Sequence, residues 1–338
     1  MTSNAGVTAP TLMRASTVVD GLALGAPSET FLDDLKRGNV NAINWTLAVE
    51  PDGMKKALMA MLGVRWLVRH APDKALIAKS VADIREARDT NRVALIQGWQ
   101  GTSPLEGDYY ALEIFWEYGL RIVQLCYNHE NALGYGSLEP RDSGLKRFGI
   151  EVVRRCNELG MLVDCSHTGT RTTLEAIAVS SKPCVISHSN PRAIHDSPRN
   201  ISDDEARACA EGGGVVGVLV CSSFLVDQTG GRRATLNDWV RCVDYLADLI
   251  GIDHVGIGTD LAARTASPIN WSETALRRYP EVNHGATFET REVEGVRSHA
   301  DFPLLVAALI ERGYSNEDVA KIIGGNWLRV YRAAWQQS

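Results

Sequence analysis

The sequence lacks the features that would place it in a membrane, in a secreted class or on a nucleic acid. None of its apolar stretches approaches the roughly 18 residues that span a bilayer. No basic segment followed by an apolar one is found near the first residue, so no secretory signal is expected. The net charge is −6, from 35 Lys and Arg against 41 Asp and Glu, which disfavours binding to nucleic acids and anionic membranes.

Cysteine occurs in an odd number and without any Cys-x-x-Cys pair. The seven cysteines are scattered at 126, 156, 165, 184, 209, 221 and 242. Small buried thiols in a reducing compartment explain this pattern, so a cytoplasmic protein is expected. Because 45% of the 338 residues are hydrophobic and only 22% are charged, disorder is excluded and a globular fold of enzyme size is expected.

Eight short apolar runs predict the strands of a parallel sheet. They are continuous rather than alternating, as expected for strands that are covered on both faces. The runs lie at residues 17–24, 40–49, 93–99, 121–128, 161–167, 183–189, 215–221 and 254–260. Segments with helical periodicity lie between them, among others at residues 108–119, 148–160, 171–181, 202–214 and 236–251. This alternation favours a (β/α)8 barrel, and a doubly wound open sheet is the alternative that strand number alone does not exclude.

The last part of the chain departs from this alternation. Residues 261–300 are rich in Arg, Pro, Asn and Glu without a strong period, and they predict a long loop over the barrel mouth. Residues 301–335 predict two further helices, the second of which begins at the N-cap Ser315. Because no repeat, low-complexity tract or linker divides the chain, one domain over residues 1–338 is expected.

Polar side chains suited to catalysis stand at the ends of several predicted strands. In a parallel barrel the working residues lie at the carboxyl ends of the strands. His167 and His188 end neighbouring runs, and Asp260 ends the last one. Two imidazoles that point at one spot can bind a divalent metal, and a nearby carboxylate can orient or deprotonate a water. The three residues together predict a hydrolytic or acid–base site, although a single histidine would more simply be structural.

Long blocks of the sequence resemble the membrane (renal) dipeptidase family of zinc peptidases. They include LVDCSHTGTRTTLEAIAVSSKPCVISHSNPRAIHDSPRN from residue 162, CYNHENALGYGSLEPRD, HVGIGTDL and the closing EGVRSHADFPLLVAALIERGYSNEDVAKIIGGNWLRVY. The resemblance covers roughly residues 17–335 and implies a (β/α)8 barrel of the metallo-dependent hydrolase type, commonly a homodimer.

The resemblance also assigns roles, because family members hold two zinc ions. His167 and His188 match the two histidine ligands of one site. Asp260 matches an aspartate ligand that is also the proposed proton shuttle. Arg199 matches the arginine that holds the substrate carboxylate, and Tyr127 takes the position of a histidine that contacts substrate.

The ligands of the other zinc site are replaced. The family's His-x-Asp corresponds to Leu22-Ala23-Leu24, and its bridging Glu corresponds to Gln100. Aliphatic side chains bind no metal, and a neutral carboxamide is a weak bridging ligand. At most one ion, Zn²⁺ or another divalent metal, is therefore expected on His167 and His188, with Gln100 or Asp260 as a third ligand. A metal-free site is the alternative.

These residues predict a dipeptidase-like hydrolase that cleaves an amide or related C–N bond of a small substrate bearing a carboxylate. Trp99, beside Gln100, is expected to contact the substrate together with Tyr127 and Arg199. Two alternatives stay open: a metal-independent lyase, isomerase or hydratase at the same barrel mouth, and a non-catalytic binding protein. The expected partners are a small molecule and a second copy of the chain, with no nucleic acid and no membrane.

Overall fold

The computed structural model describes residues 7–25, 28–262, 278–279 and 290–335. Its strands form a single sheet in the order β10, β1, β2, β4, β5, β6, β7, β8, β9, with β3 beside β4. Every named pair in this sheet is parallel. The strands are β1 Val19–Leu24, β2 Ala42–Val49, β3 Ala75–Ile77, β4 Val93–Gln100, β5 Leu120–Gln124, β6 Leu162–Asp164, β7 Cys184–Ser189, β8 Val216–Leu219, β9 Val255–Gly258 and β10 Leu261–Ala262.

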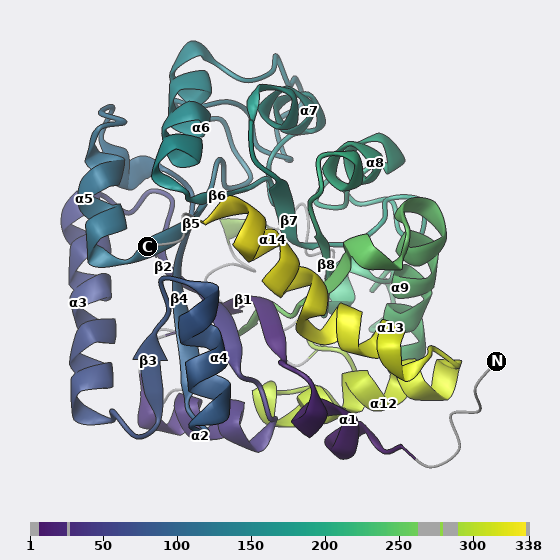
Figure 1. Cartoon of the computed structure of the whole chain (residues 1–338). Helices are drawn as coiled ribbons and strands as arrows, with labels where there is room; N and C mark the ends of the chain where they lie inside the picture. Colours follow the sequence, from purple (N-terminus) through teal and green to yellow (C-terminus); the bar gives the residue numbers. More distant parts are fainter. Residues whose placement is uncertain (1–6, 26–27, 263–277, 280–289, 336–338) are drawn as a thin grey trace.

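Contacts between the first and last strands close the sheet. β10 pairs with β1 through Ala23 and Leu24. The N–H of Asp260, between β9 and β10, donates to the carbonyl of Leu22 at 3.0 Å. The eight strands other than β3 and β10 therefore form the predicted (β/α)8 barrel, and the open sheet is excluded (Figure 1).

Helices cover the outside of the barrel, and they alternate with the strands as predicted (Figure 1). The helices that the sequence indicated between residues 108 and 251 appear as α5 Ala111–Tyr118, α6 Arg147–Leu159, α7 Thr170–Val179, α8 Asp203–Glu211 and α9 Leu236–Ile250. The others are α1 Ala9–Ala15, α2 Glu29–Arg37, α3 Met54–His70, α4 Val81–Asp89, α12 Phe302–Arg312, α13 Asn316–Ala320 and α14 Asn326–Ala334. No helix in the described part of the chain has both the length and the apolar character to cross a bilayer.

The inside of the barrel is closed at the amino-terminal end of the strands. There Trp327 of α14 is buried among apolar side chains from the beginnings of the strands, such as Val19 and Ala94. Its indole Nε1 donates to the carbonyl of Ile257 at 3.1 Å. A Cβ at Gly21 would lie 2.4 Å from the Trp327 ring, so β1 needs glycine at this point. The apolar plug leaves only the opposite, carboxyl end of the barrel for polar groups.

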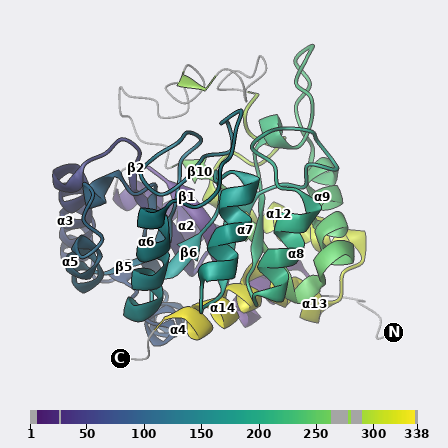
Figure 2. The same ribbon diagram turned by 90° about the horizontal axis from the view of Figure 1, so that it is seen from above.

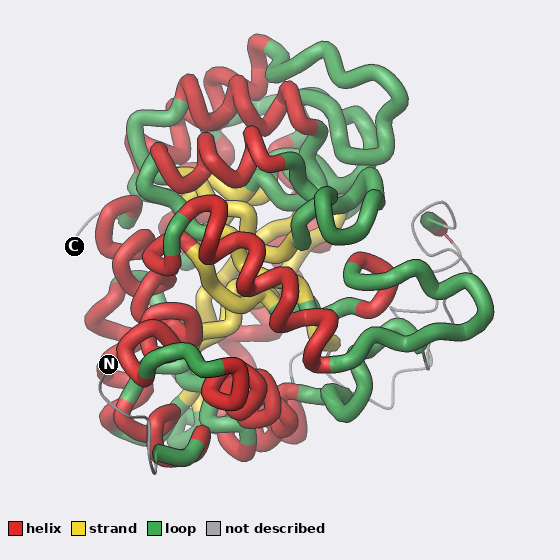
Figure 3. Tube along the Cα trace, turned by 90° about the vertical axis from the view of Figure 1, so that its right-hand side faces the viewer, coloured by secondary structure: helices red, strands yellow, loops and turns green. Residues whose placement is uncertain are grey.

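Loops that follow the strands gather at that carboxyl end (Figures 2 and 3). The long loop predicted over residues 261–300 contains β10 at its start and a short 3-10 helix, His299–Asp301, at its end. Its residues 263–277 and 280–289 lie outside the described part of the chain.

The helix that was predicted to begin at the N-cap Ser315 is not continuous, and in this respect the prediction is wrong. It divides into α13, a π-helical turn at Lys321–Gly325, and α14. The turn follows from close packing, since a Cβ at Gly324 would lie 1.9 Å from the carbonyl oxygen of Thr17. The chain before β1 therefore runs directly against this turn.

Candidate active site

Two buried imidazoles meet at the carboxyl end of the barrel. His167 follows β6, and His188 lies in β7, the neighbouring strand. Their Nε2 atoms are 2.9 Å apart, and the ring centroids are 4.9 Å apart. The structure thus brings together two of the predicted site residues, which we call the imidazole pair.

The hydrogen bonds of the other ring nitrogens fix how the imidazole pair is protonated. Nδ1 of His188 donates to the Ser187 hydroxyl at 2.7 Å, because that hydroxyl gives its own proton to the Asp164 carboxylate at 2.5 Å. Nδ1 of His167 donates to the side-chain oxygen of Asn128 at 2.6 Å. These bonds favour the neutral tautomers that carry the proton on Nδ1, in which both Nε2 lone pairs are directed at one point. The 2.9 Å separation of the Nε2 atoms also has the length of an N–H···N hydrogen bond, so a proton or a metal ion can be shared there.

Burial strengthens this arrangement. Loss of solvent lowers the pKa of both imidazoles well below the usual range, and the nearby positive charge of Arg199 lowers it further. The imidazole pair is therefore held neutral, which is the form that binds a metal ion or accepts a proton.

Backbone conformation at the barrel mouth is unusual for residues with side chains. Asn128, His167 and Asp260 have φ angles of 64°, 60° and 56°, in the left-handed region that a residue with a Cβ rarely occupies. Each of the three follows the end of a strand, β5, β6 or β9. Conformations of this kind persist where surrounding contacts enforce them, and they concentrate at functional sites.

Arg199 is a buried cation beside the imidazole pair. Its guanidinium donates to the His188 carbonyl at 2.7 Å and to the Ser189 hydroxyl at 3.3 Å. Its Nε atom has no hydrogen-bond partner, and no carboxylate in the described ranges forms an ion pair with it. Burial lowers the pKa of Arg199 to about 10. A buried positive charge that forms no ion pair can be neutralised by a ligand carboxylate.

Tyr127 and Asp260 belong to the same group of residues at the barrel mouth as the imidazole pair. The Tyr127 ring stacks on His167, with centroids 4.2 Å apart and planes 24° apart. The negative charge of Asp260 raises the pKa of Tyr127, after burial, which is the larger cause. Burial also raises the pKa of Asp260, while the charges of Arg291 and Arg199 lower it. The two candidates and both arginines therefore share one electrostatic environment.

Arg291 is a site residue that the sequence did not reveal. One of its terminal nitrogens lies 2.6 Å from the Asp260 carboxylate, and both side chains are largely buried. The Arg291 carbonyl accepts from the Ser222 N–H at 2.7 Å, so the loop after β8 holds this short segment. Arginine is common throughout residues 261–300, and only the folded contacts distinguish this one.

Glu50 is a second buried residue that the sequence analysis missed. It directly follows β2, and its carboxylate accepts from the Thr102 N–H at 3.2 Å, the Tyr127 N–H at 3.3 Å and the Asn131 side chain at 2.5 Å. Burial raises its pKa, although these bonds favour the charged form. Three donors use most of its accepting capacity, so Glu50 positions the Tyr127 backbone.

The side chains of Trp99 and Gln100 point to opposite faces of β4. Trp99 packs edge-on against Phe115 of α5, with ring centroids 4.3 Å apart, and so lies in the layer between strands and helices. Gln100, one residue on, faces the inside of the barrel, since successive residues of a strand alternate. The structure therefore brings Gln100, but not Trp99, to the side of the barrel where the imidazole pair lies, and the predicted substrate contact of Trp99 has no geometric support.

Comparison with known proteins identifies the family. The family model described as membrane dipeptidase (Peptidase family M19) matches residues 7–283 and 279–338. The chain belongs to the membrane dipeptidase family. The dipeptidase verJ of Clonostachys rogersoniana is 28% identical over 322 residues, which cover 90% of this chain and 75% of that protein. An uncharacterised protein in the pqqA 5′ region of Klebsiella pneumoniae is 29% identical over 283 residues, 81% of this chain and 94% of its own length.

Solved structures agree with this assignment. An amidohydrolase from Pseudomonas aeruginosa matches with a TM-score of 0.89 and 31% identity, covering 98% of this chain and all of that one. Membership of the membrane dipeptidase family, with relatives that are dipeptidases, makes the protein a dipeptidase-like hydrolase. The lyase and non-catalytic alternatives are not favoured.

A divalent metal, which membership of the membrane dipeptidase family suggests, fits only part of this site. The imidazole pair offers two converging nitrogen lone pairs, as a shared ion requires. The described residues contain no group of three or more His, Cys, Asp and Glu side chains placed to hold a metal ion. Leu22 is buried and Leu24 half-buried at the positions where the resemblance puts the other ligands. The donor set fits one weakly held ion on the imidazole pair.

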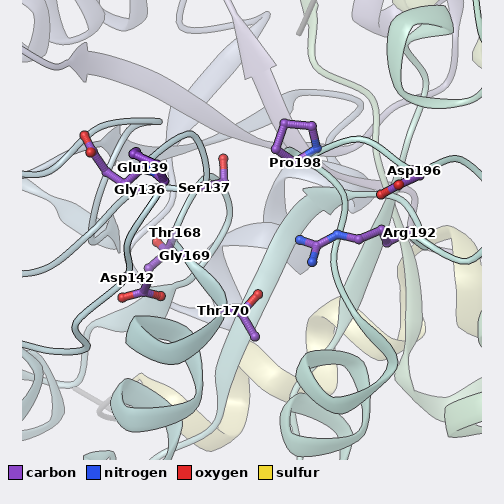
Figure 4. A pocket seen from close by; sticks show the side chains of 11 residues that line it. Gly136, Ser137, Glu139, Asp142, Thr168, Gly169, Thr170, Arg192, Asp196 and Pro198 are labelled. Carbon is purple, nitrogen blue, oxygen red and sulfur yellow. The ribbon is translucent and has the colours of Figure 1, made fainter. Parts of the chain in front are cut away.

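A polar hollow of about 480 Å³ opens among loops at the same rim of the barrel (Figure 4). The loops after β5, β6 and β7 form it, and Thr168 and Pro198 place its wall next to His167 and Arg199 in the chain. Its other polar lining includes Glu139, Asp142 and Arg192. The hollow therefore adjoins the site and leaves room on this side for a substrate that extends past it.

Proposed function

We propose that this protein hydrolyses an amide or related C–N bond in a small substrate that carries a free carboxylate. The observation that carries the proposal is the buried guanidinium of Arg199, which forms no ion pair with an acidic residue in the described part of the chain and lies against the carbonyl of His188. A carboxylate at this point would pair with a desolvated cation, an interaction that is strong in a buried site. The bond to be cleaved would then lie near the imidazole pair.

The chain's own residues supply the remaining steps. Arg199 binds the carboxylate, and the neutral Tyr127 hydroxyl, close to Asp260, can donate a hydrogen bond to the substrate. Asp260 accepts the proton of the attacking water. When the C–N bond breaks, Asp260 passes that proton to the leaving nitrogen, so that the products are a carboxylic acid and an amine.

His167 and His188 would hold one divalent ion, which would supply Lewis-acid polarisation of the carbonyl and make a nearby water more acidic. Asp164, through Ser187, orients His188, while Asn128 orients His167. Such partners fix the ring orientation and keep Nε2 free for ligation. Without an ion, the same imidazole pair and Asp260 remain as an acid–base set.

A substrate comparison tests this proposal. A dipeptide and the same dipeptide with its carboxyl end amidated differ only in the group that Arg199 would bind. The proposal predicts that kcat/KM for the free acid exceeds that for the amide by about 100-fold or more, because a buried charge pair is lost. Equal values for the two would contradict the role of Arg199, and no turnover of any dipeptide or N-acyl amino acid would contradict the reaction.

We also propose that residues 1–338 act as one domain and that the protein works in the cytoplasm as a homodimer. All seven cysteines are buried and none is paired in a disulfide, which supports a reducing compartment. Equilibrium sedimentation of the purified protein tests the dimer, and fractionation of the cells that make it tests the compartment.

A further inference from the structure

Six of the seven large hydrophobic side chains that are exposed in the described residues gather on two neighbouring helices. Met59, Leu62 and Trp66 form a stripe along α3, and their exposed fractions are 59%, 46% and 61%. A second stripe along α5 consists of Tyr110, Ile114 and Tyr118, with 62%, 51% and 41% exposed. The seventh, Leu304, lies on α12.

The two stripes are continuous with each other. α3 and α5 lie side by side on one edge of the molecule in two perpendicular views (Figures 1 and 2). The guanidinium of Arg65 on α3 lies over the Tyr118 ring of α5, 5.6 Å from its centroid, and so joins the two helices. We call these six hydrophobic residues and the charges among them the α3–α5 face. Contiguous exposed apolar surface of this kind marks an interaction site.

Charge on the α3–α5 face is divided between the helices. α3 carries Lys55, Lys56, Arg65, Arg69 and His70 on its exposed side and no acidic residue at all. The exposed side of α5 carries Glu113 and Glu117 and no basic residue. Lys56 and Glu113 already form ion pairs within the chain, with Asp52 and Arg155, whereas Arg65 and Glu117 form none with the described residues. The face is therefore complementary in charge to a copy of itself.

We propose that the α3–α5 face is the interface between two copies of this chain. Consider a twofold axis that is parallel to both helices and lies on the surface of the face, above the line where α3 and α5 adjoin. Rotation about this axis places α3 of one copy on α5 of the other. Because Arg65 is level with Tyr118 within one chain, this axis brings Arg65 beside Glu117 of the second copy. Both the apolar stripes and the opposite charges then meet, as a self-complementary interface requires.

The size of the face corresponds to a weak dimer. α3 has 17 residues and is about 26 Å long, α5 has 8 residues and is about 12 Å long, and each helix is about 10 Å wide. The face therefore covers about 400 Å², about half of the roughly 800 Å² that each partner buries in an interface of standard size. Attraction between the charged residues of the face has to supply the remaining free energy of binding, so this dimer weakens as salt concentration rises.

Sedimentation equilibrium of the full chain over a range of concentrations tests this inference. Trp66→Ser should raise the dimer dissociation constant by about tenfold or more, as aromatic residues at the centre of an interface do. The control, Leu304→Ser, removes the exposed apolar side chain of α12, which is 40% exposed, and should leave the constant within about twofold. A wild-type protein that stays monomeric up to about 100 µM overturns the inference, as does a dimer that Trp66→Ser leaves intact.

A charge reversal separates this interface from a general loss of solubility or folding. Arg65→Glu alone places like charges together and should weaken the dimer, and Glu117→Arg alone should do the same. The double variant Arg65→Glu/Glu117→Arg restores opposite charges across the axis and should recover most of the affinity. Failure of the double variant to recover it contradicts this arrangement of helices. Because none of these residues belongs to the proposed active site, hydrolytic activity reports independently on the proposed function.

Discussion

Arg199→Met separates what the active site needs from what the fold needs. The substitution keeps a side chain of similar length but removes the buried charge beside His188. Two consequences of opposite sign are expected. Substrate binding should weaken, and the folded state should become more stable.

The loss of binding follows from the proposed ion pair. A desolvated guanidinium that holds a carboxylate contributes about 2–5 kcal/mol, so KM for a carboxylate substrate should rise by roughly 30-fold or more. The preference for the free acid over the amide should vanish at the same time, because the variant no longer distinguishes them.

The gain in stability follows from the unpaired charge. Burial lowers the pKa of Arg199 to about 10, well below that of an exposed guanidinium, which corresponds to a cost of about 3 kcal/mol for the charged form. Loss of the hydrogen bonds to His188 and Ser189 offsets about 1–2 kcal/mol of this gain. The net gain of about 1–2 kcal/mol should raise Tm by about 1–3 °C.

Steady-state kinetics and calorimetry on the same preparations measure both effects. Arg329→Met is the matched control, because Arg329 also donates to backbone carbonyls, those of Gly213 and Asp253, but at the opposite end of the barrel. That variant should lower Tm and leave KM unchanged. An Arg199→Met protein with unchanged KM, or with a lower Tm and no loss of acid preference, would show that Arg199 is structural.

Three further predictions concern the imidazole pair and its surroundings. Ser187→Ala breaks the link between Asp164 and His188 and should lower kcat and metal affinity by about 10–100-fold, as measured by turnover and zinc titration, whereas a change of less than twofold would contradict the orienting role. The folded state lowers the pKa of both imidazoles, so below pH about 6.5 the unfolded chain binds more protons than the folded one. The free energy of unfolding of metal-free protein, measured by urea titration, should therefore fall by up to about 2.7 kcal/mol for each pH unit by which the pH is lowered. A free energy of unfolding that stays constant between pH 7 and 5 would contradict this. The triple change Leu22→His, Leu24→Asp and Gln100→Glu should raise the zinc content towards two ions per chain by elemental analysis, and an unchanged content would show that these positions on β1 and β4 do not face a second site.

The barrel and the positions of its functional groups could be predicted from the sequence because buried parallel strands leave continuous apolar runs. All eight predicted runs contain a barrel strand. Several strands are shorter than the runs: the run at 161–167 holds only Leu162–Asp164 as strand. The remaining residues of that run turn into the barrel mouth, and His167 in its left-handed conformation is one of them. The hydropathy of the sequence does not indicate where the backbone leaves the strand.

Partners that come from distant segments could not be predicted in this way. Arg291 reaches Asp260 across 31 residues, and contacts of its segment with the loop after β8, among them that with Ser222, fix its place. Asp20, close to the predicted mouth, proves to be structural, since its carboxylate accepts from Thr259 and lies 2.8 Å from Nε2 of His299. No local pattern distinguishes a carboxylate with such partners from one that faces substrate.

The number of metal ions bound per chain tests the central claim most directly. Elemental analysis of protein dialysed against dilute zinc should give one ion per chain for the wild type and none for His188→Ala, because the converging Nε2 atoms of the imidazole pair form the one site that the described donors fit. Two ions in the wild type, or one ion that persists in His188→Ala, would contradict the account.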